Sequence, residues 1–133
     1  MMQKAQKLAP PVAPMDDKSR ITEHISNLSH ENPLIRQMAA EYIGLLAEQY
    51  TADFVIVCGA LPELMKCIND ENPRVVEKVC WALSRIAAHG GADAVISDGF
   101  AEQLYAIVES SLRKRIERDK AAMALGYMLT LCS

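Results

Sequence analysis

The feature that most constrains this chain is an internal repeat. The tripeptide ENP occurs at positions 31–33 and again at positions 71–73. Apolar positions around it match at the same shift, and so do Gly59 and Gly99. A looser third copy runs from Gly99 to the C-terminal AMALGYML segment, with about two residues inserted around 110–113. A chain of this kind folds as a stack of similar supersecondary units.

Each copy is divided in the way expected for helices of increasing length. Residues 92–97 predict a short helix that ends at a glycine, where the chain turns at little steric cost. Residues 62–68 predict a second, medium helix. Asn72 and Pro73 then predict the N-cap and first turn of a longer helix that runs to about Ala88. The order short, medium and long predicts an all-α solenoid of about three repeats.

Composition agrees with helices. The chain is 50% hydrophobic but only 5% aromatic, which favours helices over β-sandwiches and barrels. A length of 133 residues and a net charge of −3 indicate one domain without a strong preference for nucleic acid. No apolar run reaches the roughly 18 residues of a membrane span, so no membrane is expected among the partners.

The four cysteines form no CxxC pair and lie in apolar runs. Neither a zinc site nor a disulfide framework is therefore indicated, and a reducing, cytoplasmic location is expected.

The repeat also predicts how the chain is divided. We expect a Pro-rich extended N-terminal arm, held in place by a neighbouring protein, followed by the helical repeats. The ranges are 1–20 for the arm and 21–133 for the repeats, with copies at 21–58, 59–98 and 99–133.

The middle copy closely resembles a known family. Its sequence GALPELMKCINDENPRVVEKVCWALSRIA, residues 59–87, is similar to the armadillo repeats of importin alpha, β-catenin and ciliary armadillo proteins. The resemblance extends over about residues 21–133. It implies a right-handed superhelix of stacked repeats, in which the third helices line a concave groove that binds extended segments of other proteins.

Trp81 is the residue on which this functional reading depends most. On the long middle helix, Val79, Ala82, Leu83 and Ile86 form one apolar stripe with Val75, and Trp81 lies about 155° from its centre. We interpret Trp81 as a platform in the groove on which Arg85, one turn away, can stack. The alternative is that Trp81 packs against the neighbouring copy or a loop.

The groove positions of the other copies differ from those of importin alpha. In that family a Trp and, one turn later, an Asn recur, and the Asn holds the backbone of a basic peptide. Here Arg85 replaces the Asn, so recognition of a nuclear localisation signal is not expected. The predicted groove would hold an extended segment with apolar and acidic side chains. Its residues are Glu41, Leu45, Lys78, Trp81, Arg85, Met123 and Tyr127.

Removing Trp81 and Arg85 by alanine substitution is expected to weaken partner binding without lowering thermal stability. A large loss of stability would instead place Trp81 in the core.

A second candidate site is the basic run near the start of the last helix. Arg113, Lys114, Arg115 and Arg118 form a candidate patch for an acidic protein tail or RNA phosphate, although the net charge makes nucleic acid the less favoured partner. The alternative is a solvated face on which Arg118 pairs with Glu117.

No residues suggest catalysis. His24, His30 and His89 lie in different copies without metal-ligand spacing, and the chain has neither a phosphate-binding glycine loop nor a nucleophile motif. We therefore expect no catalytic residues, no metal and no cofactor, and a protein that is not an enzyme.

The end of the stack carries a further expectation. Terminal repeats are normally capped by polar surface, but the last copy ends at residues 129–133 without a glycine or a polar helix. This predicts a subunit stacking on the C-terminal end or a chain cut from a longer solenoid, while Met1 favours a natural N-terminus.

The preferred function is that of a small structural subunit docked in a larger assembly. The resemblance suggests the cytoskeleton of a cilium as one setting. The alternative is a soluble adaptor that binds peptides for transport or signalling.

Overall fold

The computed structural model describes residues 15–131, and no strand occurs among them. The elements are α2 (Met15–Asn27), α3 (Pro33–Gln49), α4 (Ala52–Val57), α5 (Ala60–Cys67), α6 (Pro73–Ile86), the π-helical turn η1 (Ala87–Gly91), α7 (Ala92–Ser97), α8 (Phe100–Glu109) and α9 (Arg115–Leu131). This architecture confirms the predicted all-α solenoid. None of these helices is both long and apolar enough to cross a bilayer.

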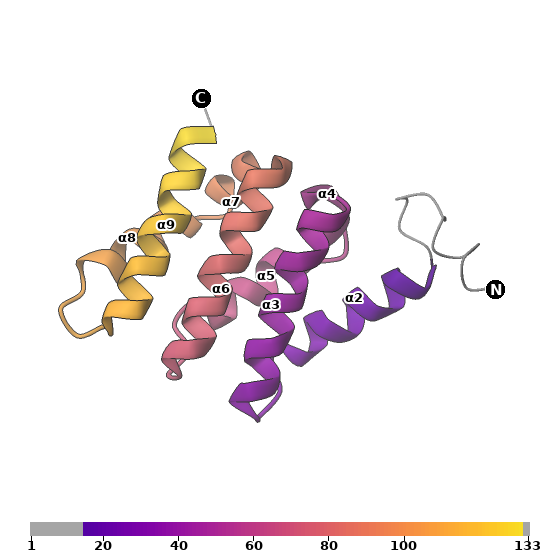
Figure 1. Ribbon diagram of the computed structural model, residues 1–133, viewed down its shortest axis with the longest axis horizontal. Helices are drawn as coiled ribbons and strands as arrows, with labels where there is room; N and C mark the ends of the chain where they lie inside the picture. The colour runs from indigo at the N-terminus through magenta and orange to yellow at the C-terminus, as the bar shows by residue number, and fades with distance from the viewer. Residues whose placement is uncertain (1–14, 132–133) are drawn as a thin grey trace, which may run out of the picture.

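The helices repeat in the predicted order of lengths. One copy consists of α4, α5 and α6, the next consists of α7, α8 and α9, and α2 and α3 precede them. The third helices α3, α6 and α9 lie side by side as one layer, with α5 and α8 behind it (Figure 1). Because α3 packs against α6 and α6 against α9, each copy buries the apolar side of its neighbour.

The long helices α3 and α6 begin in the same way. The Asn32 side chain accepts a hydrogen bond from the Leu34 amide at 2.9 Å, and Asn72 accepts one from the Arg74 amide at 2.9 Å. Proline occupies the first turn of both helices, where its missing N–H costs nothing. The predicted cap of α6 is confirmed. Equal starts also bring residues related by the ENP repeat to equivalent places on the two helices.

Two glycines make the turns into the second helices. Gly59 has a φ of 93° before α5, and Gly99 has a φ of 88° before α8. Side chains rarely adopt this left-handed conformation, so the two glycines identified by the repeat are required by the backbone.

The core follows the predicted stripe of α6. Val75, Val79, Ala82, Leu83 and Ile86 are all fully buried. The last four of these correspond to buried residues of α9 when the shift between the ENP copies is lengthened by two positions, which agrees with the expected insertion. The corresponding residues are Ala121, Ala124, Leu125 and Met128. The insertion itself is in α8, which has 10 residues against 8 in α5, and not in the loop where we expected it.

The first helix begins earlier than expected. The arm was predicted to extend to residue 20, but α2 starts at Met15, so residues 15–20 are helical. Ile21, Ile25 and Leu28 are buried, and once this side of the helix is packed, a segment without proline or glycine extends it at little cost. The rest of the predicted arm, residues 1–14, lies outside the described residues.

Candidate functional site

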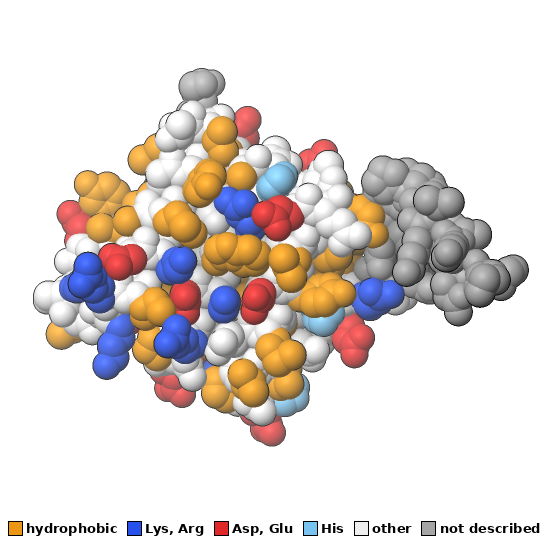
Figure 2. Space-filling view, viewed as in Figure 1, with side chains coloured by type: hydrophobic (Ala, Val, Ile, Leu, Met, Phe, Trp, Pro, Cys, Tyr) orange, Lys and Arg blue, Asp and Glu red, His pale blue; other side chains and the backbone are white. Residues whose placement is uncertain are grey.

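The seven predicted groove residues lie on the three long helices. Glu41 and Leu45 belong to α3, Lys78, Trp81 and Arg85 to α6, and Met123 and Tyr127 to α9. We call the surface formed by these three helices the third-helix face. Figure 2 shows that apolar side chains are mixed with both charges over this layer, and that Lys and Arg gather near the start of α9.

Ion pairs join α3 to α6 across the third-helix face. Lys78 Nζ lies 3.8 Å from Glu41 Oε1, and Arg85 Nη1 lies 3.0 Å from Glu48 Oε2. Two of the predicted groove residues, Lys78 and Glu41, are therefore partners of one another. Glu48 was not predicted, although it stands seven residues after Glu41, as Arg85 stands seven after Lys78. That matching spacing was a signal in the sequence.

Arg85 also contacts α9, through Tyr127. The guanidinium carbon lies 5.1 Å from the centroid of the Tyr127 ring, within cation–π distance. Desolvation lowers the Arg85 pKa, but hydrogen bonding with Glu48 and Tyr127 outweighs it and raises the pKa above its usual value. The expectation that Arg85 stacks on Trp81 is thus corrected: the aromatic partner comes from the next copy. Arg85 therefore links all three third helices.

Trp81 packs against α3 at Gly44. A Cβ atom added to Gly44 would lie 2.5 Å from Trp81 Cζ3, 2.9 Å from Cε3 and 3.1 Å from Ala82 Cα. Only glycine leaves room for this ring. Trp81 is half-buried, so the alternative reading, packing against the neighbouring copy, describes a contact that is present. Its role in binding a partner stays a prediction. Gly44 was missed because a glycine inside a helix gives no sign of what covers it.

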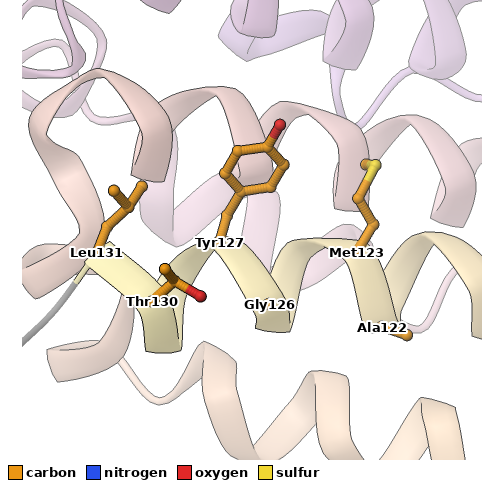
Figure 3. A pocket seen from close by; sticks show the side chains of 6 residues that line it. All are labelled: Ala122, Met123, Gly126, Tyr127, Thr130 and Leu131. Carbon is orange, nitrogen blue, oxygen red and sulfur yellow. The ribbon is translucent and has the colours of Figure 1, made fainter.

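Apolar side chains of the third-helix face remain open to solvent. Leu45 is 44% exposed and Tyr127 37% exposed, while Met123 is half-buried. A shallow groove of about 380 Å³ runs along α9, and its lining includes Met123, Gly126, Tyr127 and Leu131. Figure 3 shows Met123, Tyr127 and Leu131 rising from the same side of α9. The face thus combines exposed apolar groups with charges that are already paired.

Some side chains of the predicted basic patch already have partners within the structure. Arg113 Nη1 lies 2.8 Å from Glu117 Oε2, and Arg113 Nη2 donates to the side-chain oxygen of Asn69. Arg118 donates to the Ser110 carbonyl at 3.4 Å. Lys114 and Arg115 are exposed.

The Glu117 carboxylate explains the cations at the start of α9. Its side chain is buried, with Oε1 accepting the Lys114 amide at 2.8 Å. A carboxylate in the first turn is favourable for the helix dipole and offsets the nearby positive charges. The expected pairing of Arg118 with Glu117 is wrong, since Arg113 takes that place.

Three further titratable groups, His24, Cys67 and Cys80, are partly or fully buried. His24 stacks on Tyr42 with ring centroids 4.1 Å apart, and burial lowers its pKa. Burial also raises the thiol pKa of Cys67 to about 11 and of Cys80 to about 12. Both thiols are therefore protonated near neutral pH and poor nucleophiles.

Comparisons with known proteins agree with this geometry. The armadillo/beta-catenin-like repeat matches residues 51–88, which span α4, α5 and α6. This unit starts one short helix before the predicted copy at 59–98. No curated protein matches the chain.

Two crystal structures of engineered proteins, both from the Northeast Structural Genomics Consortium, share the fold. One has a TM-score of 0.73 at 23% identity, covering 80% of this chain and 45% of its own. The other has a TM-score of 0.73 at 16% identity, covering 91% of this chain and 52% of its own. The chain thus spans about half the length of these structures. The resemblance predicted from the sequence is confirmed at the middle of the chain, where residues 51–88 match the armadillo/beta-catenin-like repeat, and the chain as a whole shares the all-α solenoid fold of these structures.

Proposed function

We propose that this chain is a non-enzymatic scaffold for protein–protein interaction, a small structural subunit docked in a larger assembly. Armadillo repeats generally mediate such interactions. The observation that carries the proposal is the third-helix face, where Leu34, Met38, Leu45 and Tyr127 are exposed on helices that are otherwise well packed. Exposed apolar groups at regular spacing are typical of surfaces that bind another protein.

The bound segment would be extended and mainly apolar. Leu45, Met123 and Tyr127 would contact its apolar side chains. Lys78 and Arg85 are already paired with Glu41 and Glu48, so a basic segment gains nothing from them. An acidic side chain would compete with Glu48 for Arg85, whose buried Nε has no acceptor. This supports a ligand with apolar residues and an occasional carboxylate.

The location belongs to the same proposal. Cytoplasm, with a ciliary cytoskeleton as one setting, is what the armadillo resemblance suggests. A transient peptide-binding adaptor would use the same exposed side chains, and it is the second candidate. A stable subunit would co-purify with its assembly, whereas an adaptor would be recovered alone as a well-behaved monomer.

The groove is tested by selecting peptides from a displayed library of short random sequences against the full chain. Leu45→Gln removes an exposed apolar group from α3 and should abolish enrichment of the selected peptides. Val57→Gln is the matched control, because Val57 is 79% exposed but belongs to α4. If no peptides are enriched, or if both variants keep them equally, the third-helix face is not the binding surface.

A further inference from the structure

The repeat places three small residues at equivalent positions on the third helices. Ser84 follows Gly44 by the shift that relates the two ENP copies, and Gly126 follows Ser84 by the slightly longer shift that relates the buried cores of α6 and α9. Gly44 is covered by the Trp81 ring from the following copy. Ser84 is fully buried, and α9 packs on its helix. The next copy thus packs against the preceding long helix at this small residue.

Gly126 is the exception. It is exposed, and a Cβ added there would find no atom within 4 Å among the described residues. Its helix α9 is the last of the long-helix layer, with α6 on one side and no further long helix of residues 15–131 on the other (Figure 1). Gly126 of α9 is therefore uncovered by described residues, whereas the equivalent Gly44 of α3 is covered by Trp81.

The surface around Gly126 is apolar. Leu129 of α9 is 62% exposed, and Tyr105 of α8 is 56% exposed. Both line a cleft of about 480 Å³ between α8 and α9, together with Ala101, Ala106 and Leu125. This is the side that a further repeat would cover if it continued the packing seen between the existing copies.

The edge of the cleft is acidic. Glu102 and Glu109 line it, and neither takes part in an ion pair within residues 15–131. Between the existing copies, Asn69 Nδ2 donates to Gln103 Oε1 at 3.4 Å. Counted from the glycine that precedes each helix, Glu109 stands as far after Gly99 as Asn69 stands after Gly59, although Asn69 lies in the turn after α5 and Glu109 is the last residue of α8. A unit docked in the same register would place its own counterpart of Gln103 opposite Glu109.

We propose that the α8/α9 end docks a helical repeat unit of a partner protein, with a large apolar side chain over Gly126 and a Lys or Arg opposite Glu109. This inference rests on the proposed scaffold function and names the partner's chemistry at one surface. The interface continues the one between α3 and α6, in which Trp81 covers Gly44.

A second copy of this chain fits the surface poorly. In head-to-tail stacking, α3 of the second copy would bring Glu41, the counterpart of Trp81, over Gly126. The outer side of α2 would bring exposed polar residues such as Lys18, Thr22 and Glu23 to the apolar cleft. Two C-terminal ends facing each other would instead bring two sets of Glu102 and Glu109 together.

The test uses the full chain extended after Ser133 by a second copy of residues 51–88, which stands in for the partner unit. Residues 132 and 133 and the added Thr51 then separate Leu131 from the added short helix. This connection of three residues is close in length to the two residues that join α3 to α4. The extension should raise the thermal midpoint by several degrees. Gly126→Leu should remove this gain in the extended chain while leaving the unextended chain at least as stable, since leucine is the better helix former.

The charge requirement is tested in the same extended chain. The added copy carries a Glu, the duplicate of Glu63, at the Gln103 position. Replacing that Glu by Lys should raise the thermal midpoint further, and the difference should shrink as salt increases. Equal midpoints for the Glu and Lys versions at low salt would contradict the charge pairing.

Two results would overturn the proposal. The first is an extension that gives no gain, or a gain that survives Gly126→Leu. The second is a dimer of the unextended chain in light scattering that Leu129→Gln dissociates, because the occupant would then be a second copy. Failure here is distinguishable from failure of the groove, since Leu129→Gln should leave the selection of groove peptides unchanged.

Discussion

The helices α3 and α9 flank α6 on opposite sides and both have 17 residues, yet they use equivalent glycines in opposite ways. On α3, Gly44 is covered by Trp81. On α9, Gly126 has open space around it. The comparison shows that the same repeat position is part of the core where a neighbouring helix covers it and part of the surface where no helix of residues 15–131 does. Substitutions that treat the two helices differently will test it.

The largest difference is expected between the two glycines themselves. Gly44→Leu forces atoms against the Trp81 ring and the α6 backbone, and should lower the free energy of unfolding by about 3 kcal/mol. Gly126→Leu should raise it by up to about 1 kcal/mol, because leucine replaces an exposed helical glycine. Urea unfolding followed by circular dichroism measures both, and equal effects would refute the comparison.

The next largest difference in stability is expected between substitutions at the start of α9 and at the start of α3. Glu117→Ala leaves Arg113 without its carboxylate partner and the Lys114 amide without its acceptor at the start of α9, so a loss of about 2 kcal/mol is expected. At the start of α3, Asn32→Ala should cost about 1 kcal/mol, the usual effect of losing an N-cap. Glu109→Ala, which removes an exposed carboxylate, is the control. The ranking fails if Glu117→Ala is as mild as this control.

The side chains that α6 and α9 direct at the preceding helix should differ less. Trp81→Ala exposes Gly44 and should lower the free energy of unfolding by about 2 kcal/mol, less than for a fully buried tryptophan. Met123→Ala, at the equivalent position of α9, should cost about 1 kcal/mol because less side chain is lost from a half-buried site. This replaces the expectation from the sequence that Trp81 can be removed without loss of stability. Thermal midpoints unchanged by Trp81→Ala would restore it.

Arg85 contacts both α3 and α9, so small coupling free energies are expected between Arg85 and one residue of each helix. A double-mutant cycle between Arg85→Met and Glu48→Gln should give about 1 kcal/mol, because the pair is only partly shielded from water. The cycle with Tyr127→Leu should give about 0.5 kcal/mol. Coupling to Glu48 alone would mean that Arg85 does not connect α6 with α9.

The smallest effect should come from His24, which packs against Tyr42 on the α3 side. Its folded pKa lies below the unfolded value of 6.5, because burial disfavours the imidazolium. The unfolded chain therefore binds a proton first as pH falls below 6.5, and stability should decrease from there down to the folded pKa. His24→Phe should flatten this part of the pH profile of the thermal midpoint. An unchanged profile would show that His24 does not contribute.

The fold could be predicted because its signals are local. The Asn–Pro start of α6, the glycines before α5 and α8, and the apolar spacing from Val75 to Ile86 act within one helix or turn. The constant shift between copies then extends each local argument to the next one. The start of α2 was missed because the prolines before it indicated an extended arm, while burial of Ile21 stabilises a helix that begins earlier.

The candidate site was predicted less completely, for a physical reason. Periodicity placed Glu41, Lys78, Trp81 and Arg85 on one side of their helices, and the structure agrees. It did not show that Glu41 pairs with Lys78 or that Arg85 reaches Tyr127, because those contacts depend on the distance and offset between helices. The partners of Arg113 in the basic run were missed for the same reason, since its contacts to Asn69 and Glu117 depend on how the chain folds.

By itself the sequence determined an all-α stack of about three armadillo-like copies, including where the long helices begin and which residues form their apolar stripe. These properties follow from backbone preferences and helical period. Only the tertiary structure decided that Trp81 covers Gly44 and that Gly126 is uncovered by the described residues. A glycine carries no information about its neighbours, and what covers it depends on whether another helix packs there.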